Sequence, residues 1–239
     1  MNFFEVKEFF SHHGALRLTL QNQNNLTFKV TCRSRHDRMQ EMAFVIVGLG
    51  NTGKEYEKTR HNAGRMVVEL LAKTEGFEPF EYKKSANALV STGTIDGEKV
   101  TLVLPETMMN LSGKSVMSFI KSPAGAKKML VVHDELDIPL GTLKMVFGRN
   151  SGGHKGVESI MRTIKTKNFA RLRVGISGEG KKHQAKKPHG EEKVVKHVIG
   201  KFKPTDEAVL KKVLKKAVSV SGTFVTDGIE KATMQANTR

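Results

Sequence analysis

The stretch VIVGLGNTGKEYEKTRHNAG, from Val45 to Gly64, joins an apolar run to a glycine-rich loop. Gly48, Gly50 and Gly53 spell G-x-G-x-x-G, the fingerprint of many dinucleotide-binding loops. Such a loop also needs a helix that starts within the glycines and an acid about 20 residues on, at the end of the next strand. Here polar residues follow Gly53, and the acid at that distance, Glu69, sits in the helical pattern RMVVELLAKTEG. A nucleotide-dependent oxidoreductase therefore remains an alternative that rests on the glycine triplet alone.

The composition points to a protein with a polyanionic partner. The chain has 239 residues, with 40 Lys+Arg against 24 Asp+Glu and a net charge of +16. Such a balance favours nucleic acid or an acidic membrane surface as partner, and the alternative is a solubilising coat of lysines.

No apolar run approaches the roughly 18 residues that a membrane span needs. The single cysteine, Cys32, excludes an intramolecular disulfide. We therefore predict a cytoplasmic protein with no membrane partner.

Residues 1–41 differ from the rest of the chain. The segment LTLQNQNNLTFKVTCRSRHDRMQE has a polar centre, no glycine turns and, as we interpret it, no clear period. A mitochondrial transit peptide is poor in acids, so Glu5 and Glu8 argue against one and leave a mitochondrial location as the weaker alternative. We predict that residues 1–41 are a poorly ordered extension, or lie upstream of a true start at Met42.

From Met42 onward, strand and helix signals alternate, which predicts a single α/β domain over residues 42–239. Asp96-Gly97 is a turn of the kind that hairpins favour, and a long amphipathic helix begins near Pro204. We expect a mixed, twisted β-sheet with helices packed on it. Its expected strands are AFVIVG (43–48), the two halves of ALVSTGTIDGEKVTLVLP (88–105), KKMLVVHDELD (127–137), TLKMVFG (142–148) and ARLRVGIS (170–177).

Polar side chains gather at the expected strand ends and in loops, where a sheet presents them to a ligand. A histidine that meets a carboxylate from another strand can take a proton from water, because the carboxylate stabilises the protonated ring. No G-x-S-x-G motif suggests a nucleophilic serine, so a His-Asp pair that activates water is the simplest hypothesis. The candidate groups are Asn51, Tyr56, His61 and Asn62; Asn110; His133, Asp134, Glu135 and Asp137; and His154 with Lys155.

Metal binding by the group from His133 to Asp137 is the rival hypothesis. A strand projects alternate side chains to opposite faces, so these residues cannot all converge on one ion if the strand continues through them. We therefore predict no metal site and no cofactor.

Several blocks of the sequence resemble, in order and spacing, the signature blocks of bacterial-type peptidyl-tRNA hydrolases. The resemblance covers Met42 to Ala232, and several long blocks in order are far more specific than any one motif. It implies an esterase that cleaves peptidyl-tRNA between the peptide and the 3′-terminal ribose, without a cofactor and as a monomer. The blocks are VGLGNTGKEYEKTRHNAG, PETMMNLSGKSV, VVHDELDIPLGTLKM, GGHKGVES, FARLRVGIS, VIGKF and TDGIEKA.

The resemblance also implies roles for individual residues. His61 would be the general base, and Asp134 would hold and polarise it. Asn51 would contact the peptide, and the glycine loop would shape the turn that delivers Asn51 and His61. Further residues would bind substrate or line the site near the tRNA 3′ end, namely Tyr56, Met108 and Asn110. Candidates for a tRNA-binding surface are Arg173 and the lysines from Lys181 and Lys182 to Lys203.

Two positions depart from the family pattern. The family's G-G-H-N-G reads G-G-H-K-G here, so Lys155 stands where an asparagine is expected to bind substrate. Met108 stands where an aromatic residue is usual, a milder change because thioethers pack adaptably. Lys155 keeps open a second hypothesis, in which the chain is a non-catalytic RNA-binding relative that exchanged catalysis for phosphate affinity.

Overall fold

The structure is a computed structural model that describes residues 5–10, 16–21, 27–32, 43–180 and 184–238. The chain divides into two compact units, Met1–Met42 and Ala43–Arg239. No helix among the described residues is both long and apolar enough to cross a membrane.

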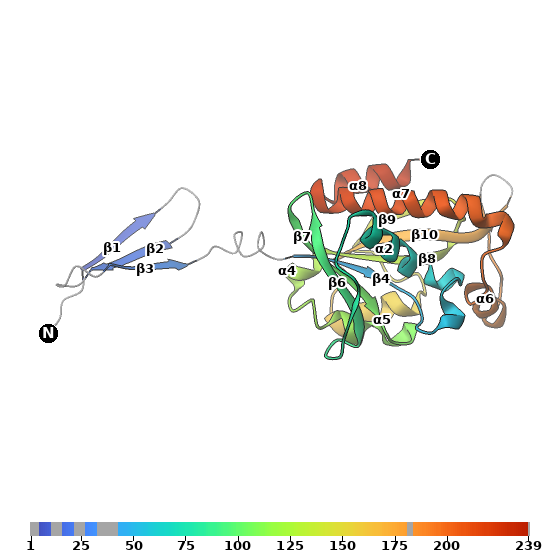
Figure 1. Cartoon of the computed structure of the whole chain (residues 1–239), viewed down its shortest axis with the longest axis horizontal. Coiled ribbons are helices and arrows are strands. Elements are labelled where there is room, and N and C mark those ends of the chain that lie inside the picture. Colours follow the sequence, from blue (N-terminus) through green and yellow to red (C-terminus); the bar gives the residue numbers. More distant parts are fainter. Residues whose placement is uncertain (1–4, 11–15, 22–26, 33–42, 181–183, 239) are drawn as a thin grey trace. The chain divides into compact units, whose positions relative to one another are not determined.

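The first unit contains a three-stranded antiparallel sheet (Figure 1). Its strands are β1 (Glu5–Phe10), β2 (Leu16–Gln21) and β3 (Thr27–Cys32), in the order β1-β2-β3. Residues 16–21, LRLTLQ, alternate apolar and polar side chains, which is the period of a strand, although no strand was predicted before Met42. That the second unit folds and works without residues 1–41 stays a prediction.

The second unit is built on one mixed sheet, as the sequence predicts. Strands β10, β8, β4 and β7 run parallel, and the other strands pair antiparallel with them or with each other. The described sheet has eight strands in the order β11-β10-β8-β4-β7-β6-β5, with β9 also on β10. Their bounds are β4 Phe44–Gly48, β5 Glu81–Lys83, β6 Ala88–Ile95, β7 Glu98–Pro105, β8 Met129–Pro139, β9 Leu143–Phe147, β10 Ala170–Glu179 and β11 Ala185–Lys186.

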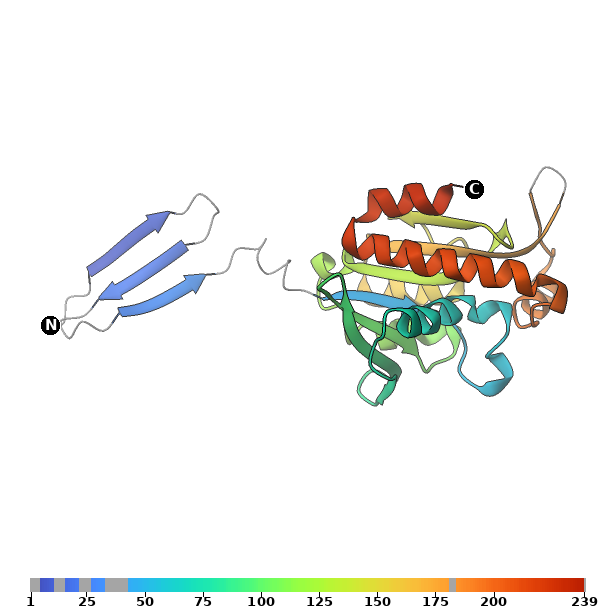
Figure 2. The ribbon, with the colours of Figure 1, turned by 45° about the horizontal axis from the view of Figure 1, so that its top comes forward.

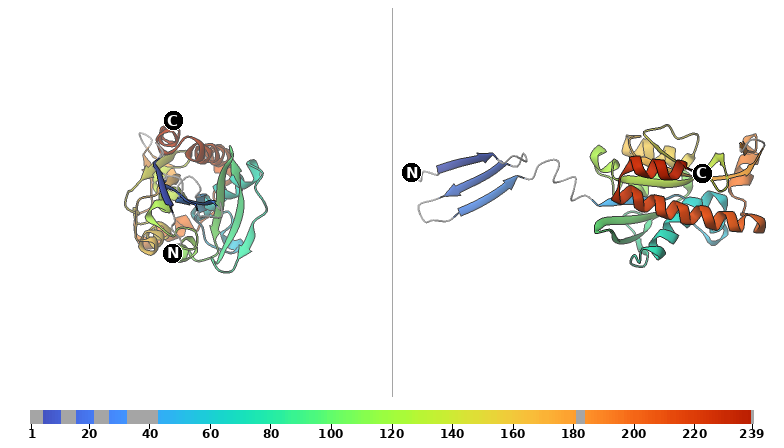
Figure 3. Two further views of the ribbon diagram at one scale, coloured as in Figure 1. Left: turned by 90° about the vertical axis from the view of Figure 1, so that its left-hand side faces the viewer. Right: turned by 90° about the horizontal axis from the view of Figure 1, so that it is seen from above.

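Helices cover both faces of this sheet. Helices α7 and α8 lie together across one face, as the orange and red ribbons of Figures 2 and 3 show, and α5 lies on the other side (Figure 1). The helices are α2 Ala63–Thr74, α3 Ser112–Val116, α4 Pro123–Ala126, α5 Lys155–Ile164, α6 Glu191–Val198, α7 Glu207–Thr226 and α8 Ile229–Asn237.

The alternation of side chains along each strand divides the core into two layers. In β4, Ile46 joins the apolar cluster that includes residues of α2, α7 and α8, whereas Val45 and Val47 join the cluster with α3 and α5. A strand buried on both faces reads as a continuous apolar run, which is why AFVIVG is apolar without a polar alternate.

Local sequence sets the turns as expected. Asp96 and Gly97 both have positive φ, 48° and 81°, which matches the tight hairpin that joins β6 to β7. Helix α7 follows a 3₁₀ turn that begins at Pro204, close to the predicted start. Strand β8 differs from the expectation. It continues through the ionisable cluster to Pro139 instead of ending there.

Candidate active site

The polar groups predicted from the sequence meet at one edge of the sheet. Parallel strands β7, β4 and β8 are neighbours, and ligands of α/β sheets bind beyond the carboxyl ends of such strands. Asn51 follows β4, Met108 follows β7, and Asp134 lies in the second half of β8. A cavity of about 720 Å³ opens there, and His61 and His154 line it with them.

Two histidines share one oxygen of a buried carboxylate. His61 Nδ1 lies 2.8 Å from Asp134 Oδ1, and His154 Nε2 lies 2.9 Å from the same oxygen. The side chain of Asp134 is 3% exposed, whereas that of His61 is 15% exposed and reaches the cavity. The carboxylate is therefore held away from solvent while the ring that it polarises remains accessible.

The hydrogen bonds assign the tautomers of both rings. His154 caps helix α5, because its Nδ1 accepts from the backbone N–H groups of Gly156 and Val157 at 3.2 and 3.3 Å. An accepting Nδ1 carries no proton, so the proton of neutral His154 is on Nε2 and is donated to Asp134. His61 donates through Nδ1, which leaves its Nε2 as the nitrogen that can take a proton.

The charges around His61 raise its pKa and hold Asp134 ionised. Burial lowers the pKa of His61, but the negative charge of Asp134 and its hydrogen bond outweigh burial, so the net shift is upward. Lys155 makes a smaller, downward contribution to the same pKa. For Asp134, burial would raise the pKa, but the charges and hydrogen bonds of His61 and His154 hold it far below its usual value. Asp134 therefore stays ionised wherever the protein is folded and working.

Close backbone contact aligns the two catalytic candidates. A Cβ atom on Gly64 would lie 2.1 Å from the carbonyl oxygen of Val132, so only glycine allows the start of α2 to touch β8 there. A Cβ on Gly50 would lie 2.9 Å from the Asn62 side chain, and Gly53 has a φ of +111°. The glycines of the opening stretch thus provide close packing and a turn, and they bring His61 to Asp134.

Asn51 is held in one orientation. Its backbone N–H donates to Asn62 Oδ1 at 2.8 Å, and Asn62 Nδ2 donates back to the Asn51 carbonyl at 3.0 Å. Its own side-chain Oδ1 accepts from the backbone N–H of Met109 at 3.0 Å. Because Oδ1 is occupied, the amide nitrogen Nδ2 of Asn51 is the group left for a ligand.

The remaining substrate-binding candidates line the same cavity, namely Tyr56, Met108, Asn110 and Lys155. Met108 is 49% exposed, so its thioether is available for contact. The side chain of Lys155, the departure from the family pattern, is 65% exposed, and its Nζ lies 3.7 Å from Glu191 of α6. Lys155 thus stands at the rim of the cavity, opposite α6.

The ionisable residues of β8 have different partners. His133 is fully buried, its Nδ1–H donates to the Asp134 carbonyl at 2.7 Å, and burial lowers its pKa well below the usual value. Glu135 accepts from Arg173 at 2.7 Å, and Asp137 accepts from Lys187 at 2.6 Å.

Arg173, a candidate for the tRNA surface, is thus already paired with a buried carboxylate. It lines a smaller cavity of about 240 Å³ together with Arg149 and Arg171. Lys181 and Lys182 lie outside the described residues.

One trio offers ligand-type atoms for a metal. Among the described residues, the ligand atoms of His61, Asp134 and His154 lie within 4.8 Å of one another. However, Nδ1 of His154 already accepts two backbone hydrogen bonds, so a metal at Nε2 would require a ring without any proton. This donor set suits a hydrogen-bonded trio better than a metal site.

No role was predicted from the sequence for His154, which was named only with Lys155, or for Asn62, which was named only within a polar group. A signal for His154 was present, because a polar residue directly before a helical pattern is a capping candidate. Helix α5 begins at Lys155, so His154 is its N-cap.

Comparisons with known proteins agree with this geometry. The sequence profile of the family described as peptidyl-tRNA hydrolase matches residues 45–239. A peptidyl-tRNA hydrolase of Aquifex aeolicus is 44% identical over 176 residues, which cover 73% of this chain and 85% of the relative. One of Syntrophotalea carbinolica is 36% identical and covers 82% of this chain and 97% of the relative.

Solved structures show the same likeness. The crystal structure of peptidyl-tRNA hydrolase from Acinetobacter baumannii superposes with a TM-score of 0.73 at 35% identity, and the match covers 83% of this chain and 96% of that one. A crystal structure of a peptidyl-tRNA hydrolase in complex with N-propanol gives a TM-score of 0.72 at 36% identity. The match covers 82% of this chain and 94% of that one. The chain, with its histidines bound to one buried carboxylate at the edge of a mixed sheet, belongs to the peptidyl-tRNA hydrolase family of enzymes.

Proposed function

We propose that this chain hydrolyses the ester bond of peptidyl-tRNA with His61 as general base. The observation that carries the proposal is the 2.8 Å contact between His61 Nδ1 and the buried Asp134 carboxylate, beside a cavity of about 720 Å³. The pairing leaves His61 Nε2 free to accept a proton, which ester hydrolysis by water requires.

The reaction needs only one proton shuttle. A water between His61 Nε2 and the ester gives its proton to Nε2 as its oxygen attacks the carbonyl carbon. The resulting imidazolium is stabilised by Asp134, as the raised pKa of His61 indicates. When the tetrahedral intermediate collapses, the bond to the ribose oxygen breaks and Nε2 returns the proton to that oxygen. The products are a peptide carboxylic acid and a tRNA with a free terminal hydroxyl.

Asn51 suits the recognition of the peptide. Its Nδ2 is a donor fixed in place by the Met109 and Asn62 contacts, so it can bind a peptide carbonyl without reorganisation. A blocked amino group brings such a carbonyl, and a free aminoacyl-tRNA lacks it. We propose that this contact favours N-blocked substrates.

The arginines provide a place for tRNA phosphates. Arg149, Arg171 and Arg173 line a cavity that shares Glu135 and Gly152 with the catalytic one. Arg173 is ion-paired with Glu135, and Arg171 donates to two backbone carbonyls. Among the described residues, the guanidinium of Arg149 has neither kind of partner, so it is the one most available to a phosphate. The surface would then position tRNA while His61 does the chemistry. We further propose that the enzyme works as a monomer in the cytoplasm.

Turnover of two substrates tests the proposal. The unaltered chain should hydrolyse N-acetyl-aminoacyl-tRNA and leave unblocked aminoacyl-tRNA largely intact. His61→Ala should lose about 10²–10⁴-fold in kcat while its affinity for tRNA stays nearly unchanged, because a positioned general base contributes about that much. Binding of tRNA without any turnover by the unaltered chain would instead support the non-catalytic relative, and turnover of both substrates alike would remove the role of Asn51.

A further inference from the structure

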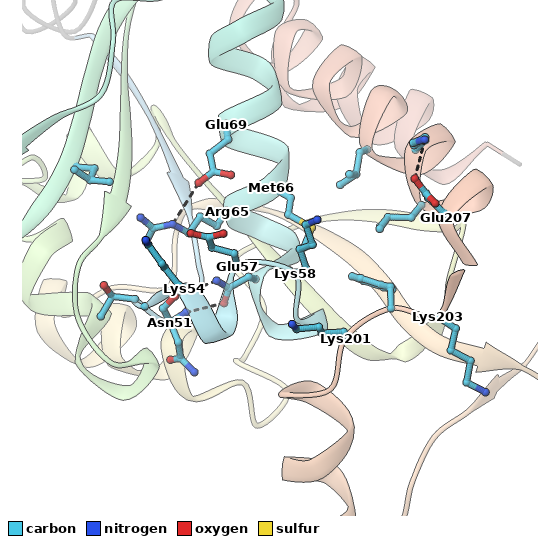
Figure 4. Close-up of a pocket in the computed structure, with 18 of the residues that line it drawn as sticks. Asn51, Lys54, Glu57, Lys58, Arg65, Met66, Glu69, Lys201, Lys203 and Glu207 are labelled. Atoms are coloured by element: carbon cyan, nitrogen blue, oxygen red, sulfur yellow. Dashed lines mark hydrogen bonds and ion pairs between the residues drawn. The ribbon is translucent and has the colours of Figure 1, made fainter. Parts of the chain in front are cut away.

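A second, larger cavity lies beside the catalytic one and has no role in the mechanism above. It has a volume of about 1040 Å³ and runs between the segment after Asn51, helix α2 and the start of α7 (Figure 4). We call it the distal groove. Asn51 lines both cavities, so the groove adjoins the catalytic site at the residue proposed to hold the peptide.

The walls of the distal groove combine apolar and cationic groups. Apolar side chains from four segments line it, namely Met66, Leu89, Phe202, Leu210 and Leu214. Lys54, Lys58 and Lys201 also line it, and none of them makes an ion pair within 4.0 Å among the described residues. Figure 4 shows Lys58 next to Met66, with Lys201 below them.

Most acids of the groove already have partners. Arg65 holds both Glu106 and Glu69, the latter at 3.4 Å. Glu207 holds Lys211 at 2.8 Å. The distal groove therefore combines lysines without ion-pair partners among the described residues with an apolar lining. Most of its carboxylates are paired with Arg65 or Lys211.

Two occupants have the required negative charge, RNA and an acidic peptide. RNA that binds in grooves stacks its bases on exposed aromatic rings, and Phe202 is the one aromatic residue that lines this groove. An extended peptide, in contrast, can pack aliphatic side chains against the apolar lining of the groove and place carboxylates next to its lysines.

We propose that the distal groove binds the part of the substrate's peptide that lies upstream of the esterified residue, and that it favours apolar and acidic side chains. This inference rests on the proposed function. A six-residue peptide extends at most about 20 Å, whereas a single N-acetylated residue extends only about 7 Å. The short substrate fills the catalytic cavity near Asn51, and the long one continues past Asn51 into the groove.

Three tRNA substrates separate these contacts: N-acetyl-aminoacyl-tRNA, a hexapeptidyl-tRNA with glutamates in its upstream half, and the same hexapeptidyl-tRNA with lysines there. The variant is Lys54→Glu with Lys58→Glu, both exposed positions. The matched control is Lys212→Glu with Lys215→Glu, exposed lysines of α7 that do not line the groove.

The unaltered enzyme should show a lower KM for the glutamate peptide than for the lysine peptide. Reversing the two groove charges should raise the KM of the glutamate peptide about tenfold, since two exposed charge contacts are each worth up to about a factor of five. The same variant should lower the KM of the lysine peptide. It should leave kcat unchanged, and also the KM of the N-acetyl substrate. The control variant should preserve the order of the two peptides.

Other outcomes overturn the inference in distinguishable ways. If the groove variant raises the KM of all three substrates equally, the groove binds tRNA and not peptide. If the two hexapeptides behave alike with the unaltered enzyme while the N-acetyl substrate is hydrolysed, the groove does not bind peptide, and the proposed function stands. If no substrate is hydrolysed, the proposed function fails and the inference fails with it.

Discussion

Replacing Asp134 by asparagine should separate the charge of the carboxylate from its geometry. Both histidines donate to the same oxygen, Oδ1, at 2.8 and 2.9 Å. An asparagine keeps one carbonyl oxygen with two lone pairs, so it can accept from both rings in the native position. What Asp134→Asn removes is the negative charge that stabilises protonated His61.

The loss of rate follows from that charge. Unit charges about 3 to 4 Å apart interact by about 4 to 6 kcal/mol at an effective dielectric of 20, before the cost of burial is subtracted. If about 3 to 4 kcal/mol of this acts in the transition state, kcat falls by about 10²–10³-fold. The fall should be smaller than that of His61→Ala, because the base itself remains.

The pH profile of Asp134→Asn provides the sharper measurement. Activity needs neutral His61, so it falls as the pH drops through the pKa of His61. In the unaltered protein Asp134 raises that pKa, so the acidic limb is expected on the high side of the usual histidine value. Without the Asp134 charge, burial and Lys155 both lower the pKa of His61, so the acidic limb should move below that of the unaltered enzyme.

The assay is kcat and kcat/KM for N-acetyl-aminoacyl-tRNA from pH 5 to 8.5. The matched control is Asp137→Asn, the same chemical change on the same strand, where the carboxylate is exposed and pairs with Lys187. Its kcat should change less than about twofold, because exposed pairs contribute little. Native kcat and an unmoved acidic limb in Asp134→Asn would refute the mechanism.

Four further results are expected. His154→Asn keeps a side chain that can cap α5 but cannot reach Asp134, so thermal stability should hold while kcat falls about tenfold or more, the value of a hydrogen bond to a charged group. Lys155→Asn should raise kcat, weaken tRNA affinity modestly and move the acidic limb of the pH–rate profile to higher pH, whereas an unmoved limb would show that Lys155 does not act on the base. Arg173→Ala should reduce the free energy of unfolding in urea by about 1–3 kcal/mol, because it leaves a buried carboxylate without its partner, and the salt dependence of tRNA affinity should change little. A chain of residues 42–239 should fold and hydrolyse substrate like the full chain, and loss of its cooperative unfolding would contradict that.

The sequence predicted the fold and the family correctly for physical reasons. AFVIVG is apolar throughout because β4 is buried on both faces, and Asp96-Gly97 supplies the positive φ values that its hairpin needs. Helix α7 begins close to Pro204 as expected. The pairing of His61 with Asp134, proposed from the resemblance, is present in the structure at hydrogen-bond distance.

The sequence could not predict contacts that depend on strand register or on helix starts. The parallel pairing of β10 with β8 places Arg173 opposite His133, and its Nε donates to Glu135, two residues farther along β8. No local pattern shows which residues of two distant strands become neighbours. The role of His154 depends on where α5 begins, and helix ends are set within a residue or two by the cap itself.

The cap on α5 has a consequence for how the enzyme loses activity. One imidazole, that of His154, joins the first turn of the helix to the carboxylate that polarises the base. Unwinding of that turn releases Nδ1, frees the ring to change tautomer and withdraws a donor from Asp134. The order of the first turn of α5 and the basicity of His61, which lies on another segment, are therefore coupled. Mild heat or denaturant that frays only Gly156 and Val157 should therefore lower kcat, by about the factor expected for His154→Asn, before the sheet unfolds.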